Sequence, residues 1–253
     1  MSSKVLSGRR NVHPAQAYPV IVPGYELTFD MAGLPYWEPG FGTIEPVGNS
    51  SGAGEECTAK DAAAEGRPLL STSKHPATAT SVPGNRVGGP LHCVAFQITR
   101  QELEHIVNTE GGSGNPEFGY RLVSIPCETY SGQHLVGMTL VNSQVIATGM
   151  RPSPRYHNIL IEGAGEHGLA PEYLARLKTI EPFVAKTPGQ KAAKYLMLVL
   201  VLPAMLPALA FGFAALAFDV KTPRVVAVYN EWVTRVMWSV HSWIIAPVFG
   251  KGC

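Results

Sequence analysis

A run of 24 residues without a single charge, Tyr195 to Phe218, constrains this 253-residue chain more than any other feature. At about 1.5 Å per residue, a helix over this run would reach roughly 36 Å, more than the ~30 Å hydrocarbon core of a bilayer. We therefore predict a transmembrane helix over residues 195–218. The alternative is a buried core helix, although core helices are usually shorter and amphipathic.

The position of this run near the C-terminus predicts a topology. No apolar segment follows Met1, so we expect no signal peptide. A folded part ahead of one late span predicts a single-pass membrane protein whose N-terminal domain is cytosolic, with a linker over 184–194. The tail, 219–253, mixes tryptophans with aliphatic residues and predicts an amphipathic, interfacial segment. A second, poorer span over 225–249 stays open.

Charge and the metal-binding residue types exclude several classes of protein. The sequence has 20 Lys and Arg residues and 19 Asp and Glu residues, which gives a net charge of +1. It therefore lacks the excess of positive charge that is typical of nucleic-acid-binding proteins. The four cysteines have irregular spacing, which matches neither a zinc pattern nor a secreted disulfide framework. The eight histidines are scattered and His-Glu-x-x-His is absent. We expect no nucleic acid, no metal and no cofactor.

The first part of the chain has the signals of paired strands. Val20–Val22 precede Pro23-Gly24, a turn dipeptide, and Tyr25–Asp30 then alternate apolar with polar residues. Glycines and prolines over 33–42 predict an irregular stretch. From 47 to 88 the sequence is rich in Gly, Ser, Ala, Thr and Pro, which predicts a long flexible insertion.

The middle of the chain alternates strands with helices. Residues 91–98 are apolar and β-prone, and Thr99 with Glu102 forms a capping box, so a helix is predicted to begin at Arg100. The other predicted elements are a strand pair over 120–129 and 134–141 and helices over 156–164 and 171–180. The sum is an α+β fold with a small, mixed or largely antiparallel sheet or barrel and flanking helices.

Glu110 is the candidate for acid–base chemistry. It closes the predicted helix directly before Gly111 and Gly112. A helix C-terminus carries partial negative charge, so we expect the pKa of this carboxyl to be raised. A carboxyl with a raised pKa can exchange protons near neutral pH. The alternative is a solvated glutamate at a frayed helix end.

Three separated blocks of sequence resemble one family in its own order. They are PGYELTFD followed by GTIEP, HCVAFQITRQELEHIVNTEGG, and SPRYHNILIEGAGEHGLAPEYLARLKTIEP. These blocks resemble the γ-glutamylcyclotransferase family over about residues 1–183, with the 47–88 stretch unmatched. The resemblance implies one domain of that family over 1–183, built as a small β-barrel with flanking helices.

The resemblance also implies a reaction and a set of site residues. Family members cyclise a γ-glutamyl group to 5-oxoproline and release the amine. The implied role of Glu110 is to take a proton from the substrate's α-ammonium and to give one to the leaving nitrogen. Tyr120 and Tyr156 match the two tyrosines that flank the substrate pocket in the family. For Tyr120 the alternative role is a core aromatic residue that starts a strand. For Tyr156 it is a residue that packs a helix.

One departure concerns the start of the chain. The family opens with a strand and a Tyr-Gly-Ser-Asn loop that cradles the γ-glutamyl group, and this sequence has no Tyr-Gly-Ser-Asn. Residues 1–4 resemble the sequence that follows the loop, so Met1 and Ser2 are the nearest remaining substrate-binding positions. We expect a chain that begins here to be less active and less stable than one extended upstream, because an oxyanion donor contributes about 3–4 kcal/mol of transition-state stabilisation.

Two functions from different classes follow. The first is a membrane-tethered γ-glutamylcyclotransferase that acts on γ-glutamyl amino acids or on glutathione-derived conjugates, with a membrane partner through 195–218. The second is a non-catalytic module of the same shape that binds a ligand at the membrane. The absent loop favours the second function, and the retained Glu110 favours the first.

Overall fold

The computed structural model describes residues 6–8, 12–47, 86–109, 120–142, 150–217 and 224–253. Its strands are β1 (Gln16–Val22), β2 (Tyr25–Leu34), β3 (Glu38–Pro46), β4 (Arg86–Val87), β5 (Leu91–Gln97), β6 (Tyr120–Thr129) and β7 (His134–Asn142). Its helices are α2 (Arg100–Thr109), α3 (Pro154–Glu166), α4 (Pro171–Thr179), α5 (Pro188–Ala217), α6 (Arg224–Val240), a π-helical turn (His241–Ile245) and α7 (Ala246–Phe249).

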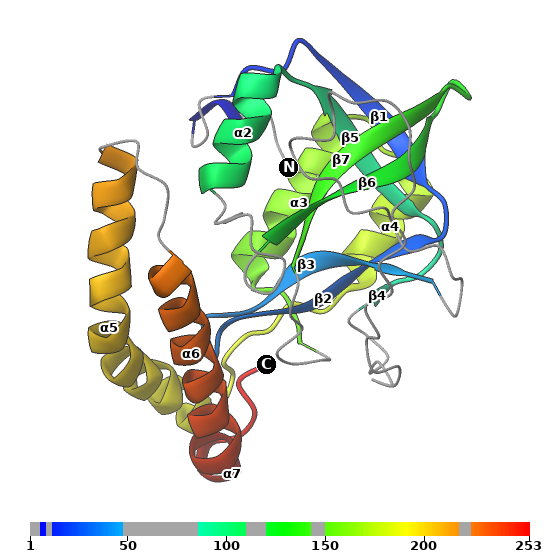
Figure 1. Cartoon of the computed structure of the whole chain (residues 1–253). Coiled ribbons are helices and arrows are strands. Elements are labelled where there is room, and N and C mark those ends of the chain that lie inside the picture. The colour runs from blue at the N-terminus through cyan, green and yellow to red at the C-terminus, as the bar shows by residue number, and fades with distance from the viewer. Residues whose placement is uncertain (1–5, 9–11, 48–85, 110–119, 143–149, 218–223) are drawn as a thin grey trace.

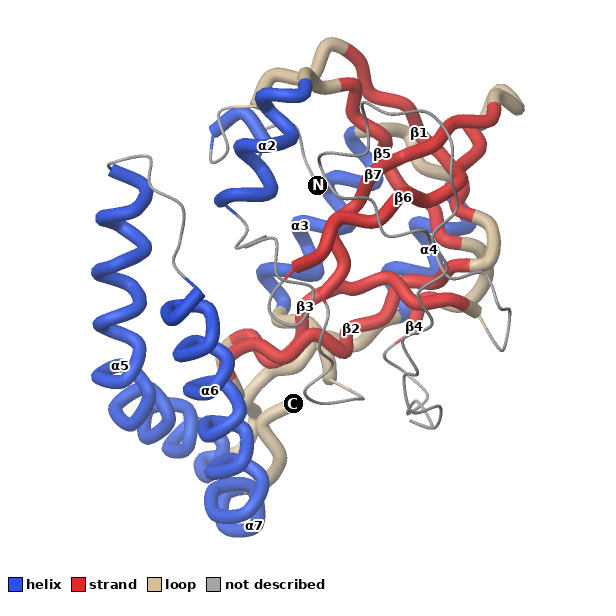
Figure 2. The backbone as a smooth tube through the Cα atoms, in the orientation of Figure 1, coloured by secondary structure: helices blue, strands red, loops and turns tan. Residues whose placement is uncertain are grey.

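The described strands form two antiparallel sheets (Figures 1 and 2). One sheet has the order β5-β1-β6-β7, and the other has the order β3-β2-β4. The predicted α+β class is therefore correct, but the described strands do not close into a barrel. Barrel closure needs a continuous ladder around the whole sheet, whereas β1 and β2, which follow each other in sequence, belong to different sheets.

The Pro23-Gly24 turn joins these two sheets, as its position between two strand patterns predicted. Gly24 adopts a φ of +74°, which favours glycine. The prediction of an irregular stretch over 33–42 was wrong, because β2 runs to Leu34 and β3 begins at Glu38. Gly40 explains the difference: a Cβ there would lie 2.8 Å from the carbonyl oxygen of Phe29, so glycine is needed for the close approach rather than for a loop.

One apolar core lies between the sheets and two helices. Strand residues such as Val20, Phe29 and Ile125 pack in one cluster with Tyr173 and Leu177 of α4. Figure 1 shows α3 and α4 behind the strands. The predicted helices over 156–164 and 171–180 correspond to α3 and α4, because Pro154 and Pro171 each occupy a first-turn position that suits proline.

The capping box that predicts the start of α2 is confirmed. The amide of Glu102 donates to Thr99 Oγ1 at 3.2 Å, and the amide of Thr99 donates to Glu102 Oε2 at 2.8 Å. The Thr99 amide, the His13 amide and the Thr99 hydroxyl lower the pKa of Glu102. The ionised Glu102 carboxylate therefore stabilises the folded state. This stabilisation is present above the ordinary pKa of a glutamate and is lost as pH falls through the lowered pKa of Glu102.

We expect Thr99→Ala to lower the free energy of unfolding by about 1 kcal/mol, because one of the orphan amides of α2 loses its acceptor. Chemical denaturation measures the change. Thr179→Ala at the end of α4 is the matched control, with an expected change within about 0.5 kcal/mol because its hydroxyl is exposed and donates to a helix-end carbonyl. Equal effects at the two positions would contradict the cap.

The C-terminal part of the chain is a helical hairpin, defined here as α5 and α6. Figure 1 shows the two helices side by side at one flank of the molecule. Within α5 the segment Pro188–Phe211 is long and apolar enough to cross a membrane, with a mean hydropathy of 1.9 and 11% of its most apolar window buried. The helix therefore begins inside the predicted linker at 184–194 and continues through Pro203 and Pro207.

The C-terminus returns to the α+β domain. The amide of Tyr36 donates to the Gly252 carbonyl at 2.9 Å, and the hydroxyl of Tyr36 donates to the Gly250 carbonyl at 2.6 Å. Burial raises the pKa of Tyr36 to about 12, so this hydroxyl stays protonated near neutral pH. A single span would separate the C-terminus from the domain by the ~30 Å width of a membrane core, whereas here the two are in contact. The single-pass topology stays a prediction.

Candidate functional site

Tyr156 lies in the first turn of α3, where the chain positions it through a helix cap. Ser153 is the N-cap residue, and its Oγ accepts a hydrogen bond from the Tyr156 amide at 3.1 Å. The tyrosine ring is half-buried and meets Phe41 and Phe29 edge-on, with ring centroids 5.3 and 6.4 Å away. The sequence Ser-Pro-Arg-Tyr therefore fixes both the start of the helix and the direction of this side chain.

The hydroxyl of Tyr156 lies against the backbone of β3. The amide of Gly42 donates to Tyr156 Oη at 3.2 Å. A Cβ at Gly42 would lie 3.1 Å from the same oxygen, so glycine leaves the room for this close approach. A hydroxyl held in this way is oriented by the backbone rather than by a mobile side chain.

Tyr120 begins β6, and its hydroxyl contacts the sulfur of Met31 at 2.9 Å. Met31 of β2 is the direct cross-strand partner of Phe41 of β3, which packs against Tyr156. Side chains directly opposite each other on antiparallel strands project from the same face of a sheet. The structure thus brings Tyr120 and Tyr156, which are far apart in sequence, to neighbouring residues on one face.

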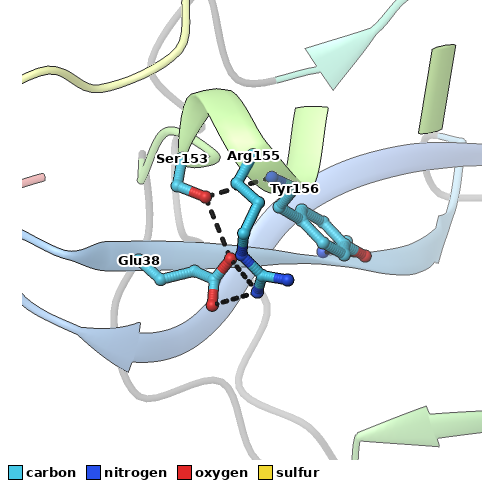
Figure 3. A network of polar contacts seen from close by, with 5 residues as sticks. Glu38, Ser153, Arg155 and Tyr156 are labelled. Carbon is cyan, nitrogen blue, oxygen red and sulfur yellow. Dashed lines mark hydrogen bonds and ion pairs between the residues drawn. The ribbon is translucent and has the colours of Figure 1, made fainter. Parts of the chain in front are cut away.

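A polar network connects β3 to the start of α3 (Figure 3). Arg155 Nη2 donates to both carboxylate oxygens of Glu38, at 2.7 and 2.8 Å. Ser153 Oγ donates to Glu38 Oε1 at 2.9 Å. Glu38 therefore holds the capping serine and the arginine that flank Tyr156, and the three side chains orient the first turn of α3.

A groove of about 720 Å³ lies beside this network, between the α+β domain and the C-terminal hairpin. Its walls are largely apolar, and Phe41 forms part of them while also packing on Tyr156. Glu38 and Arg155 line the same groove. The candidate site therefore combines one ion pair and an apolar wall, with Tyr156 packed behind Phe41.

The remaining predicted site residues, Glu110, Met1 and Ser2, lie outside the described residues. Glu110 directly follows Thr109, the last residue of α2. Sequence reasoning missed Glu38, because its partner Arg155 is 117 positions away and no local pattern connects them. The Ser-Pro sequence at 153–154 is a helix-start signal that indicates the cap.

Cysteine and metal chemistry have little support at this site. Burial raises the pKa of Cys93 to about 12 and also raises the pKa of Cys127. Both thiols therefore stay protonated at neutral pH, and a thiol in that state is a weak nucleophile. Within the part of the chain that the structure describes, no group of three His, Cys, Asp or Glu residues could hold a metal ion.

Two curated proteins are similar to the chain over its full length. Gamma-glutamyl cyclotransferase aclK of Aspergillus oryzae is 27% identical over 268 residues, which cover 100% of this chain and 86% of that protein. Gamma-glutamyl cyclotransferase gliK of Claviceps purpurea is 23% identical over 257 residues, which cover 100% of this chain and 99% of that protein. No family model matches the chain.

Two solved structures are similar at a lower level. A gamma-glutamyl cyclotransferase structure has a TM-score of 0.46 at 17% identity and covers 77% of this chain and 95% of its own. The human uncharacterized protein loc79017 has a TM-score of 0.44 at 17% identity and covers 71% of this chain and 86% of its own. Neither overlap is close enough to define the fold or the reaction of this chain.

The class of protein is thus an α+β domain with an apolar groove that is lined by the Glu38–Arg155 ion pair and lies beside Tyr156. Over its full length, the chain is similar to two curated proteins that are both named gamma-glutamyl cyclotransferase. These relatives support a cyclotransferase function at the level of the family.

Proposed function

We propose that this protein cyclises a γ-glutamyl group to 5-oxoproline and releases the attached amine. The observation that carries this proposal is the similarity, along the whole chain, to two curated γ-glutamyl cyclotransferases. The substrates that we propose are γ-glutamyl amino acids or γ-glutamyl groups on glutathione-derived conjugates.

The reaction is intramolecular. The α-amine nitrogen of the γ-glutamyl group attacks its own γ-carbonyl carbon, which closes a five-membered ring, and the bond from that carbon to the leaving nitrogen breaks. In our proposal Glu110 accepts the proton that the α-ammonium loses and delivers one to the departing nitrogen. Because both reacting groups belong to one molecule, the protein's tasks are to fold the substrate and to move protons.

Tyr120 and Tyr156 are the proposed flanks of the substrate pocket. Their contacts with the paired residues Met31 and Phe41 support a shared location. The apolar wall beside Tyr156 supports the removal of water from the substrate, which strengthens hydrogen bonds to the reacting groups.

A membrane attachment is the second part of the proposal. The attachment uses residues 195–218, and the α+β domain faces the cytosol. The length and apolar composition of α5 support it. The proposed reaction is tested separately from this attachment, because Tyr120, Tyr156 and Glu110 precede residues 195–218 in the sequence.

We expect Tyr156→Phe to lower 5-oxoproline release from a γ-glutamyl amino acid by about tenfold, because a substrate hydrogen bond of about 1.4 kcal/mol is lost. The ring keeps its contacts with Phe29 and Phe41, and the loss of the bond from the Gly42 amide should lower the free energy of unfolding by about 1 kcal/mol. Liquid chromatography of 5-oxoproline formed by the purified full chain measures the rate.

Tyr130→Phe is the matched control. Its hydroxyl also accepts from a backbone amide, that of Ala170 at 2.9 Å, but it lies on the turn between β6 and β7. The control should keep the wild-type rate. A wild-type chain that binds γ-glutamyl amino acids without releasing 5-oxoproline would replace this proposal with the non-catalytic binding module.

A further inference from the structure

The C-terminal hairpin leaves the α+β domain and comes back to it. At its base, Trp37 Nε1 donates to the Lys194 carbonyl of α5 at 3.1 Å, and Trp238 Nε1 of α6 donates to the Gly33 carbonyl at 3.0 Å. Between the two helices, Tyr229 Oη donates to the Ala204 carbonyl at 2.7 Å. Both helices are therefore joined to the same domain at the same end.

The last residues of the chain close this base. Besides the two bonds from Tyr36, the side chain of Gln190 donates to the Lys251 carbonyl at 3.0 Å, and the amide of Gly252 donates to His241 Nε2 at 3.1 Å. A Cβ at Gly252 would lie 2.7 Å from the ring of Tyr36, so the tail is packed tightly against the domain. The C-terminus cannot lie across a membrane from the domain while these contacts exist.

Away from its base, the hairpin exposes apolar side chains over a wide arc. On α5, Val199 is 68% exposed, Leu206 54% and Phe213 71%. At about 100° per residue, the exposed positions from Met205 round to Leu200 cover roughly 220° of the circumference. A helix that packs on one protein partner needs only a stripe about 100° wide, whereas lipid surrounds a helix on all its free sides.

A narrower apolar row continues along α6 into the π-helical turn. Val225, Val228, Trp232 and Val236 are spaced three or four residues apart, Trp243 follows seven residues after Val236, and all five are exposed. The exposed surface of the hairpin is thus apolar on both helices.

The base of the hairpin has the composition of a membrane interface. Tyr195 is 63% exposed and meets Trp37 edge-on, with ring centroids 6.4 Å apart. Lys194 Nζ lies 3.9 Å from the centre of the Trp37 ring, and Trp243 is 83% exposed. Tryptophan, tyrosine and lysine gather at the level of lipid headgroups, so this belt identifies lipid as the occupant of the apolar surface above it.

The polar residues of α6 limit how the hairpin lies. The helix has 17 residues, or about 25 Å, which is shorter than the ~30 Å hydrocarbon core. Glu231 and Arg235 form an ion pair at 2.6 Å on its surface, and Arg235 is 59% exposed. Charges of this kind are costly at the centre of a bilayer, which disfavours a complete crossing by α6.

We propose that the C-terminal hairpin enters a lipid bilayer from the side of the α+β domain, so that the domain and the C-terminus lie on the same side. The inference rests on the membrane attachment in the proposed function and is independent of the proposed reaction. In this proposal the membrane anchor is a hairpin rather than a single crossing. The base of the anchor is the interfacial belt formed by Trp37, Lys194, Tyr195 and Trp243.

Vesicle flotation of the full chain tests the lipid contact, with sealed vesicles of phosphatidylcholine and phosphatidylserine. We expect the double variant Leu206→Glu with Trp232→Glu to lower the vesicle-bound fraction at least about tenfold, because carboxylates are costly in hydrocarbon. Val136→Glu is the matched control, since Val136 is 75% exposed on β7, away from the hairpin, and should float like the wild type. A wild-type chain that stays unbound, as a monomer or as a dimer of this surface, would overturn the attachment.

Thiol labelling in sealed microsomes tests the topology separately. Lys251→Cys and Lys178→Cys each place a cysteine at an exposed position, one at the C-terminus and one on α4. A membrane-impermeant maleimide, read out by peptide mass spectrometry, should label both sites in a ratio that detergent does not change. Membrane-bound protein whose Lys251→Cys site is protected until detergent is added would overturn the hairpin anchor and leave the attachment standing.

Discussion

Glu110→Gln should lower the kcat/KM for 5-oxoproline release by about 10²–10⁴-fold, the range that a general acid–base group contributes. Glutamine keeps the size of the side chain but can neither accept the α-ammonium proton nor deliver one to the leaving nitrogen. Steady-state rates on a γ-glutamyl amino acid, measured with the full chain, give the ratio.

The control for this variant lies on α2, which ends at Thr109 directly before Glu110 in the sequence. Glu104→Gln removes an exposed carboxylate that pairs with Arg100 at 3.1 Å on α2, and it should leave the rate unchanged. Unfolding curves of both variants should match that of the wild type, which separates lost chemistry from lost structure. Turnover at the wild-type rate in Glu110→Gln would remove this residue from the mechanism.

Phe29→Ala should lower the free energy of unfolding by about 3–5 kcal/mol, because a fully buried aromatic ring is replaced by a cavity. Phe29 lies in the cluster that joins both sheets to α3 and α4, and it supports the ring of Tyr156. Urea denaturation followed by tryptophan fluorescence measures the change.

Val136→Ala is the comparison for this prediction, since Val136 is 75% exposed and its truncation should change stability by no more than about 0.5 kcal/mol. Phe29→Leu should recover most of the loss, because leucine fills much of the same volume. If Phe29→Ala were as stable as Val136→Ala, the placement of Phe29 in the core would be wrong.

Local sequence signals predicted the elements that depend on neighbouring residues. The Thr99–Glu102 capping box, the Pro23-Gly24 turn and the β6–β7 strand pair all occur where the sequence placed them. In each case the interacting groups lie within a few residues of each other, so the local sequence is enough to predict the element.

The features that the sequence did not predict concern contacts between distant segments. Glycines over 33–42 indicated a loop, yet Gly40 serves the close approach of backbone from Phe29. An uncharged run indicated a single crossing, yet contacts from Tyr36 to the C-terminal residues turn the run into one arm of a hairpin. The composition of a segment shows how apolar it is. It does not show which other segment of the chain it contacts.

The candidate site divides in the same way. Tyr120 and Tyr156 could be named from the resemblance of their surrounding sequence to a family. Their common location depends on the pairing of Met31 with Phe41, and the orientation of α3 depends on Glu38. These residues come from β2 and β3, which carry no motif that connects them to either tyrosine.

By itself the sequence determined the α+β class, the caps and turns, the apolar run near the C-terminus and the family resemblance, because each of these arises from residue types at short spacing. Only the tertiary structure decided that the strands form two sheets, that Tyr120 and Tyr156 contact the cross-strand partners Met31 and Phe41, and that the C-terminus returns to the domain. Those features depend on hydrogen bonds and packing between distant segments, as between Tyr36 and Gly250, which are 214 residues apart.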